Sequence, residues 1–246
     1  MLTPTLLLLA AFALLGALVE GLSGFGFGLV TMSLLPLVIP VEQAVPMVGA
    51  WGLSLNLLNT WNRRRHIQPR RILPMLVAAA MGIPVGLTFL TRAPESLVTG
   101  TLGVVILAYV GLALSGRVRP GIGGDDRRWA FLAGLLGGAL GGAFNTSGPP
   151  VVLYLSSRGW TKEQTIGAMQ AFFTFTSSLT FVGFVAYGLI TRTLLGWILP
   201  ILPIVWIGLL VGSAINNRIP QLAFQRLVLG LLAVLGFNFL GRSLLG

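Results

Sequence analysis

A run of small polar residues interrupts an apolar stretch in the second half of the chain. Asn145, Thr146 and Ser147 are followed by Gly148 and by Pro149–Pro150. Proline suits the first turn of a helix and Asn, Thr or Ser suits the cap before it, so this run predicts a helix that begins inside the apolar stretch. A helix start directs backbone N–H groups and a positive dipole end outward. The chemistry that these residues predict is therefore anion binding without an arginine.

A glycine-rich run, Ser23-Gly-Phe-Gly-Phe-Gly28, occupies the corresponding place in the first half, with Pro36 eight residues after its last glycine. Glycine exposes backbone, which is tolerated at membrane depth only where protein or a water-filled cavity surrounds it. Close helix packing is the other explanation for small residues, and it is favoured for the glycines taken singly. For the polar run in the second half a binding site is favoured, because three polar groups at a break need partners.

Glu20 is the one acid inside a predicted membrane span. An intramembrane carboxylate is costly, so it is a functional hypothesis by default, either as a proton carrier or as a partner for a polar group. The alternative is that Glu20 contacts water near the hairpin turn or caps a helix. Both readings stay open from the sequence.

Uncharged polar residues also lie within two predicted spans. Gln170 is a candidate site residue because it follows the second hairpin closely in sequence. Asn56 and Asn59 are better explained by hydrogen bonds between helices. The Glu42-Gln43 pair recurs as Glu163-Gln164, 121 residues later, and at this offset Asn56 corresponds to Ser177.

Catalysis and metal binding are poorly supported. Ser147 before Gly148 is the only fragment that resembles a nucleophile, and no histidine or lysine lies within a span to activate it. The single histidine, His66, follows a run of arginines, and the chain has no cysteine, so an ordinary metal site cannot be assembled. The sequence predicts a protein that is not an enzyme and that needs no cofactor.

The composition indicates a membrane protein. Of 246 residues, 55% are hydrophobic and 9% are charged, against about 25% charged residues in soluble domains. The net charge of +10 comes almost wholly from arginines in short loops, which favours a role in membrane orientation over nucleic-acid binding. Residues 1–18 lack the basic region of a cleavable signal, so we expect a retained first helix.

Apolar runs between Pro, Gly and charged residues predict an all-α polytopic protein with ten segments in a single transmembrane domain. The first two segments of each half are short or broken and read as helical hairpins, each followed by three transmembrane helices. Repeat one covers about residues 6–116, a cytoplasmic linker 117–128, and repeat two 129–246. The segments are 6–22, 26–39, 43–62, 70–91, 95–116, 129–144, 148–158, 163–190, 193–215 and 219–243.

The two halves carry a repeated motif. Gly82, Gly86, Arg92 and Pro94 recur 126 residues later as Gly208, Gly212, Arg218 and Pro220. Five segments is an odd number, so the second half must enter the membrane in the opposite sense, as in the inverted repeats of many secondary transporters.

The positive charges fall unevenly between the two faces that alternating segments create. One face collects thirteen basic residues, which places it in the cytoplasm and both termini outside. Arg92 then lies outside and its repeat mate Arg218 inside, as inversion requires. The thirteen are Arg63, Arg64, Arg65, Arg70, Arg71, Arg117, Arg119, Arg127, Arg128, Arg158, Lys162, Arg218 and Arg226, and the other face holds Arg92, Arg192 and Arg242.

These motifs resemble a known family. The run S-G-F-G-F-G with its following proline and the run N-T-S-G-P-P-V-V-L-Y-L are similar to those of the sulfite exporter TauE/SafE family, also called the toluene sulfonate uptake permease family. The resemblance covers residues 6–245 and includes the plan of two halves. Phe25 and Phe27 depart from the commoner pattern, in which a tighter glycine run is frequent.

The resemblance implies a multi-pass permease of a bacterial inner membrane that moves sulfite or organosulfonates, and it alone favours export over uptake. It also implies that Gly24, Gly26 and Gly28 line the anion site together with residues 145–149. From the residues, we expect alternating access with the two hairpins meeting near the midplane, Glu20 as a candidate for proton coupling, and contacts with lipids. A channel or a scramblase is the alternative, and a homo-oligomer is open.

Overall fold

The computed structural model describes residues 4–63, 69–115, 127–216 and 221–245. His66 and the arginines Arg64, Arg65, Arg117, Arg119 and Arg218 lie outside these ranges, whereas Arg127 and Arg128 of the predicted linker belong to a helix. The described residues form helices and no strand, which confirms the predicted fold class. The helices are α1 (Pro4–Ser23), α2 (Phe27–Leu34), a 3₁₀ turn (Leu35–Leu37), α3 (Val41–Arg63), α4 (Pro69–Arg92), α5 (Glu95–Leu114), α6 (Arg127–Phe144), α7 (Gly148–Ser156), α8 (Lys162–Ala186), α9 (Arg192–Ile215) and α10 (Gln221–Leu245).

Nine of the ten predicted segments each correspond to one helix, with boundaries that agree within a few residues, and the segment predicted at 26–39 comprises α2 and the 3₁₀ turn after it. The eighth segment was predicted to reach residue 190, but α8 ends at Ala186. Gly188 adopts a φ of 69°. The N–H of Gly188 donates to Val185 O at 3.0 Å and that of Leu189 to Phe184 O at 2.9 Å, which closes the helix with a glycine C-cap.

Five of the described helices are long and apolar enough to cross a membrane. They lie at Pro4–Ser23, Arg70–Arg92, Glu95–Leu114, Glu163–Ala186 and Arg192–Ile215. The second helix of each hairpin is much shorter, with 8 residues in α2 and 9 in α7. At 1.5 Å per residue, these helices reach about 12–14 Å, less than half of a hydrocarbon core of about 30 Å. The prediction of short, broken segments at these two places is confirmed.

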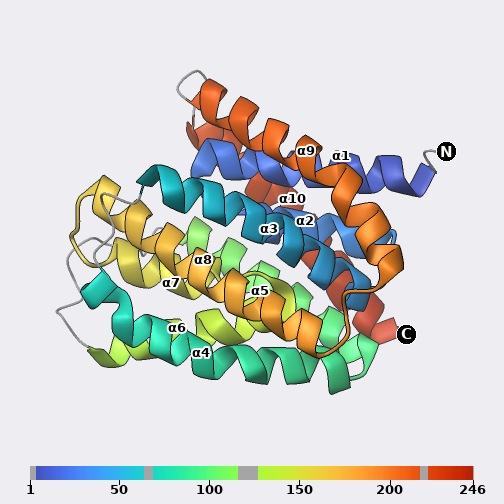
Figure 1. Cartoon of the computed structure of the whole chain (residues 1–246), viewed down its shortest axis with the longest axis horizontal. Coiled ribbons are helices and arrows are strands. Elements are labelled where there is room, and N and C mark those ends of the chain that lie inside the picture. Colours follow the sequence, from blue (N-terminus) through green and yellow to red (C-terminus); the bar gives the residue numbers. More distant parts are fainter. Residues whose placement is uncertain (1–3, 64–68, 116–126, 217–220, 246) are drawn as a thin grey trace. The chain divides into compact units, whose positions relative to one another are not determined.

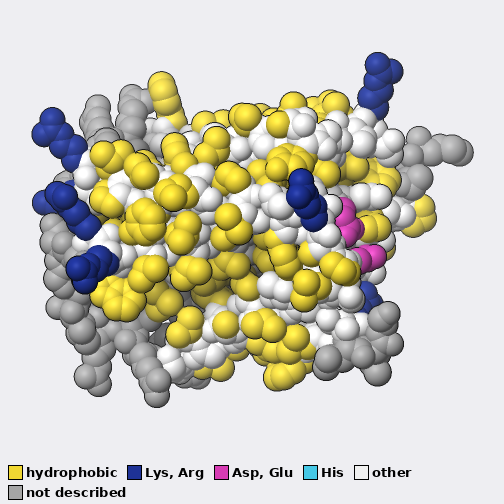
Figure 2. Space-filling model, turned by 90° about the horizontal axis from the view of Figure 1, so that it is seen from below, with side chains coloured by type: hydrophobic (Ala, Val, Ile, Leu, Met, Phe, Trp, Pro, Cys, Tyr) yellow, Lys and Arg dark blue, Asp and Glu magenta, His cyan; other side chains and the backbone are white. Residues whose placement is uncertain are grey.

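Apolar side chains on the outside of these helices fit a lipid environment. On α4, Leu73, Val77, Met81 and Val85 are between 51% and 63% exposed. Their spacing of four residues places them on one stripe of the helix. Figure 2 shows hydrophobic side chains over much of the face that it draws. In a soluble protein an apolar surface of this extent would promote association, whereas lipid tails accept it.

The helices fall into two compact units, and each unit mixes both halves of the sequence. The first unit comprises residues 1–51, 92–115 and 190–246, and the second comprises 52–91 and 116–189. The long helix α3 contributes its first part to the first unit and the rest to the second.

In the first unit, α1 and α9 run side by side in the same direction (Figure 1). Glycines allow the two backbones to touch. A Cβ on Gly212 would lie 2.5 Å from Leu18 O and 3.0 Å from the Cα of Gly21, and a Cβ on Gly208 would lie 3.1 Å from Leu14 O. Such close backbone approach is the usual use of small residues between membrane helices.

The other long pair of the first unit, α5 and α10, is antiparallel. Gly100 faces Ser243, whose hydroxyl donates to Ser96 O at 2.8 Å, and Gly103 faces Gly236. Elsewhere in this unit, the indole N–H of Trp51 donates to Ile198 O at 3.0 Å and joins α3 to α9.

In the second unit, α4 and α6 repeat the arrangement of α1 and α9. Gly82 and Gly86 on α4 face the backbone of α6 at Leu135 and Ala139. Successive contacts advance along both helices together, so the two helices are parallel. Three glycines of α6 face α4 in return, namely Gly134 against Met75, Gly138 against Ala79 and Gly142 against Ile83.

The repeated glycines therefore make the same kind of close backbone contact in the two units. Gly82 and Gly86 join the fourth helix of the first half to the first helix of the second half, and Gly208 and Gly212 do the reverse. The two halves thus exchange their fourth helices, because each fourth helix packs against the first helix of the other half.

Candidate functional site

The break in the second hairpin is built by an asparagine in a left-handed conformation. Asn145 has a φ of 53°, and no other non-glycine residue of the described chain has a positive φ. Asparagine tolerates this region better than most residues because its side chain can bond locally. The N–H of Asn145 donates to Gly141 O at 2.9 Å and that of Thr146 to Leu140 O at 3.3 Å, which closes the end of α6.

The helix that follows begins as predicted, but its cap differs. Gly148 is the first residue of α7, and Pro149 and Pro150 lie in its first turn. Ser147 occupies the cap position with φ −64° and ψ −14°, and its side chain accepts no hydrogen bond from the helix. This helical backbone geometry differs from the extended conformation that a side-chain cap usually needs, so the predicted hydroxyl cap is wrong. The Ser147 hydroxyl lies instead over the α-carbon of Gly141.

The two prolines also reduce the number of backbone donors at this helix start. Proline has no N–H, so Gly148 and Val151 are the donors left in the first turn of α7. This helix start therefore offers an anion fewer backbone N–H groups than a helix start without prolines would. Further donors can come from the backbone N–H of the cap residue Ser147 or from a side chain.

Thr146 provides a side-chain donor at this break. Its side chain is 2% exposed, and its hydroxyl finds no hydrogen-bond partner in the described part of the chain. A buried hydroxyl without a partner costs about 1–3 kcal/mol, so it is unusual unless a ligand or a water satisfies it. Thr146 is therefore a buried hydroxyl donor two residues before the start of α7.

The first hairpin turns in the same way, with glycine where the second has asparagine. Gly24 has a φ of 81°, and its N–H donates to Glu20 O at 2.7 Å. Gly26 has a φ of 110° and directly precedes α2. The offset of 121 residues that relates Glu42 to Glu163 also relates Gly24 to Asn145.

Glu20 is 4% exposed and its carboxylate accepts a hydrogen bond from the N–H of Phe27 at 3.0 Å. Phe27 is the first residue of α2, so the carboxylate caps this helix. Of the readings that the sequence left open, helix capping is the one that the structure shows. A negative charge at a helix start is favoured by the helix dipole.

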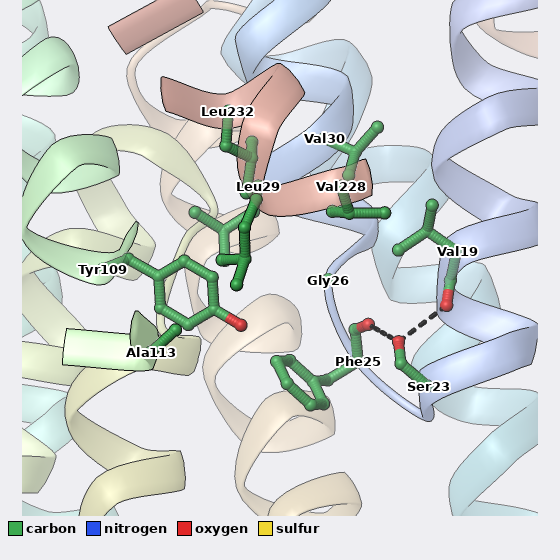
Figure 3. Close-up of a pocket in the computed structure, with 11 residues that line it drawn as sticks. Val19, Ser23, Phe25, Gly26, Leu29, Val30, Tyr109, Ala113, Val228 and Leu232 are labelled. Carbon is green, nitrogen blue, oxygen red and sulfur yellow. Dashed lines mark hydrogen bonds between the residues drawn. The ribbon is translucent and has the colours of Figure 1, made fainter. Parts of the chain in front are cut away.

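A cavity of about 260 Å³ lies beside this first hairpin, within the first unit. Ser23, Phe25 and Gly26 line it together with Tyr109 of α5, and aliphatic side chains of α1, α2 and α10 complete the wall. Figure 3 shows the Tyr109 hydroxyl directed toward the segment at Phe25 and Gly26. Of the three predicted glycines, Gly26 lines the cavity, Gly24 makes the turn and Gly28 lies in the first turn of α2.

The Ser23 hydroxyl cannot satisfy both of its neighbours at once. Its oxygen lies 2.6 Å from Val19 O and also contacts Phe25 O (Figure 3). A serine carries one hydroxyl proton, so it donates to one of these carbonyls at a time. The sequence reading missed Tyr109, because a tyrosine within an apolar span looks like an ordinary packing residue.

Polar residues of α3 and α8 form a ladder in the second unit. The Asn56 amide donates to the Ser177 hydroxyl at 3.2 Å, which confirms the predicted bond between helices. The Thr60 hydroxyl donates to Gln170 O at 3.0 Å, and Thr174 donates to Asn56 O at 2.9 Å. Gln170 itself is 1% exposed, so it belongs to the buried seam between these helices.

Basic and aromatic residues meet at the end of α7. The guanidinium of Arg158 lies 5.2 Å from the ring centre of Tyr154, and that of Arg71 lies 5.6 Å from the ring centre of Trp160. Burial, and then the positive charge of Arg71, lowers the pKa of Arg158 from its ordinary value. Amphipathic rings with arginine at a helix end are typical of the membrane interface.

Comparison with known proteins identifies the family. Residues 8–239 match the family described as sulfite exporter TauE/SafE. The chain belongs to this family. It is 25% identical over 240 residues to a protein of Cupriavidus necator named "Probable sulfite/organosulfonate exporter TauE", with 95% of this chain and 93% of that one covered. No solved structure matches the chain.

Membership of the TauE/SafE family confirms the resemblance found in the motifs and makes the chain a membrane transporter. It also agrees with the prediction that the chain is not an enzyme. The Ser147 hydroxyl, the only candidate nucleophile, is packed against Gly141.

Proposed function

We propose that this TauE/SafE family member is a secondary transporter that exports sulfite or a small organosulfonate from a bacterial-type cell. The observation that carries the proposal is the buried Thr146 hydroxyl, which has no partner among the described residues and lies two residues before the start of α7. A helix start and a free hydroxyl supply hydrogen bonds to an anion without a fixed positive charge. The name of the Cupriavidus relative supports the choice of sulfur-containing anions.

In this proposal the anion binds at the second hairpin. Thr146 donates its hydroxyl proton to an oxygen of the substrate, and Gly148 supplies the first backbone N–H. Asn145 holds the turn, Ser147 fills the space over Gly141, and Pro149 fixes the first turn of the helix. Gln170 holds α8 beside α3 and supports the site from behind.

Alternating access is the mechanism that we propose, because inverted repeats of the predicted kind are common in transporters that work in this way. Inversion would place both termini outside the inner membrane, with the arginine-rich loops in the cytoplasm. Glu20 is our candidate for proton coupling, because it is the one buried acid among the acids that the structure describes. Saturable flux would distinguish this carrier from a channel, which is the alternative.

The proposal is tested by uptake of radiolabelled sulfite into proteoliposomes by wild type and Thr146→Val. Valine keeps the shape of threonine and removes the hydroxyl. Loss of a hydrogen bond to a charged group costs about 1.5–3 kcal/mol, so we expect the KM to rise about tenfold or more.

Thr180→Val is the matched control, because Thr180 is 1% exposed on α8 and its hydroxyl also finds no partner in the described residues. We expect this variant to transport like wild type. Equal effects of the two substitutions would show that Thr146 has no special role, and absence of saturable flux from wild type would remove sulfite as the substrate.

A further inference from the structure

We infer that Glu20 is a built-in anion that fills, at the first hairpin, the position that the substrate anion takes at the second. The inference rests on the proposed function and adds to it the number of substrate anions that the chain binds. The two hairpins have helix starts at equivalent positions, but only the one at α7 lacks a side-chain cap. The chain therefore holds one substrate anion.

The equivalence of the two helix starts follows from backbone geometry at the offset of 121 residues. Gly24 and Asn145 both have positive φ, at 81° and 53°. The N–H of each donates to the carbonyl four residues earlier, which belongs to Glu20 in one hairpin and to Gly141 in the other. Glu20 and Gly141 thus occupy the same place in the two turns.

The side chains at this shared place differ completely. Glu20 sends a carboxylate oxygen to within 3.0 Å of the Phe27 nitrogen at the start of α2. Gly141 has no side chain, and the Ser147 hydroxyl covers its α-carbon. The start of α7 receives no side-chain cap, and the buried Thr146 hydroxyl beside it has no partner in the described chain.

Electrostatics explains why this difference selects one hairpin. A carboxylate at a helix start uses the same N–H groups and the same dipole that would attract a free anion. A second negative charge beside it would be repelled, strongly so in an apolar environment. Glu20 therefore excludes the substrate from the first hairpin, whereas the second hairpin contains no acidic side chain at the matching place.

The number of bound anions tests the inference. Equilibrium binding of radiolabelled sulfite to the purified full chain should give one site per molecule. Glu20→Ala empties the start of α2, so we expect a second site. Glu20→Gln should keep one site, because the amide oxygen of glutamine can still accept the Phe27 N–H.

The reciprocal substitution tests the inference at the second hairpin, where it adds an acidic side chain at residue 141. Gly141→Glu with Ser147→Gly recreates the first hairpin, since Gly26 is the counterpart of Ser147, and removing the serine hydroxyl clears the contact that a Cβ at 141 would make. We expect sulfite affinity to fall about tenfold or more. Gly141→Ala with Ser147→Gly is the control, because alanine adds a Cβ without an oxygen that could accept an N–H, and it should bind more tightly than the glutamate variant.

The outcomes separate this inference from the proposed function. One site in wild type, one in Glu20→Ala and equal affinity of the two 141 variants would overturn the inference and leave transport at the second hairpin standing. If Glu20→Ala does not fold, the pair at residue 141 decides alone. No sulfite binding by wild type would overturn the proposed function, and the inference with it.

Discussion

A single carboxylate distinguishes the two hairpins at the residue scale. Glu20 is buried and bonded to the start of α2, whereas the matching Gly141 leaves the start of α7 uncapped. An ionisable group held in this way has two roles available to it, as a fixed partner of the helix and as a group that gains and loses a proton. The two roles require different experiments.

Replacement of Glu20 by glutamine tests proton coupling. If this carboxylate carries the coupled proton, wild-type sulfite flux into proteoliposomes should respond to an imposed pH gradient, and Glu20→Gln flux should not. The helices that pack most against α1 are α2 and α9, and Arg192 is their one charged residue, so no other acid or histidine of these helices can take over. A gradient response that persists in Glu20→Gln would exclude this residue as the proton carrier.

Individual residues differ in how well the sequence predicted them. The bond between Asn56 and Ser177 could be predicted, because a buried amide between membrane helices needs a partner. The role of Ser147 could not, since its hydroxyl looked like a cap and the backbone geometry turned out to be helical. Tyr109 became visible only when the structure placed it at the cavity.

At the scale of elements, small residues decide which helices touch. A Cβ on Gly212 would collide with the backbone of α1, and equivalent contacts hold α4 against α6. Backbone atoms cannot yield as a flexible side chain can. The seams between these helix pairs are therefore intolerant of added volume.

Substitution of Gly212 by alanine should destabilise the protein by roughly 1–3 kcal/mol, the usual cost of an overpacked contact. Gly196→Ala on the same helix is the control, because nothing lies within 4 Å of a Cβ at that position. Alanine there should be neutral or slightly stabilising, since it favours the helix. Thermal unfolding of the purified variants in detergent measures the stability of each. Equal melting temperatures would show that the contact between α1 and α9 can accommodate an added methyl group.

At the scale of the whole molecule, the inverted arrangement is a prediction that labelling can test. The chain has no cysteine, so single cysteines can be placed without background. Glu95 follows α4 and Asn216 follows α9, and both are exposed. In intact cells, a membrane-impermeant maleimide should label Glu95→Cys from outside, and it should reach Asn216→Cys only after permeabilisation. Labelling of both sites from the same side would contradict the inversion.

The sequence by itself determined the class of the molecule and the repeat. Apolar runs, arginine-rich loops and paired glycine motifs depend on local composition and spacing, and they predicted the ten helices and the two short hairpins. The same motifs indicated the TauE/SafE family. These features can be predicted from the sequence because each depends on residues that are close together along the chain.

Only the tertiary structure decided which elements pair and which polar groups are satisfied. The exchange of fourth helices between the halves joins residues far apart in the sequence, such as Gly86 and Ala139. The same holds for the hairpins, where both polar groups are buried but the Glu20 carboxylate has a hydrogen-bond partner and the Thr146 hydroxyl has none among the described residues. The physical reason is that hydrogen bonds and close contacts depend on where the folded chain places each atom, which neither composition nor spacing records.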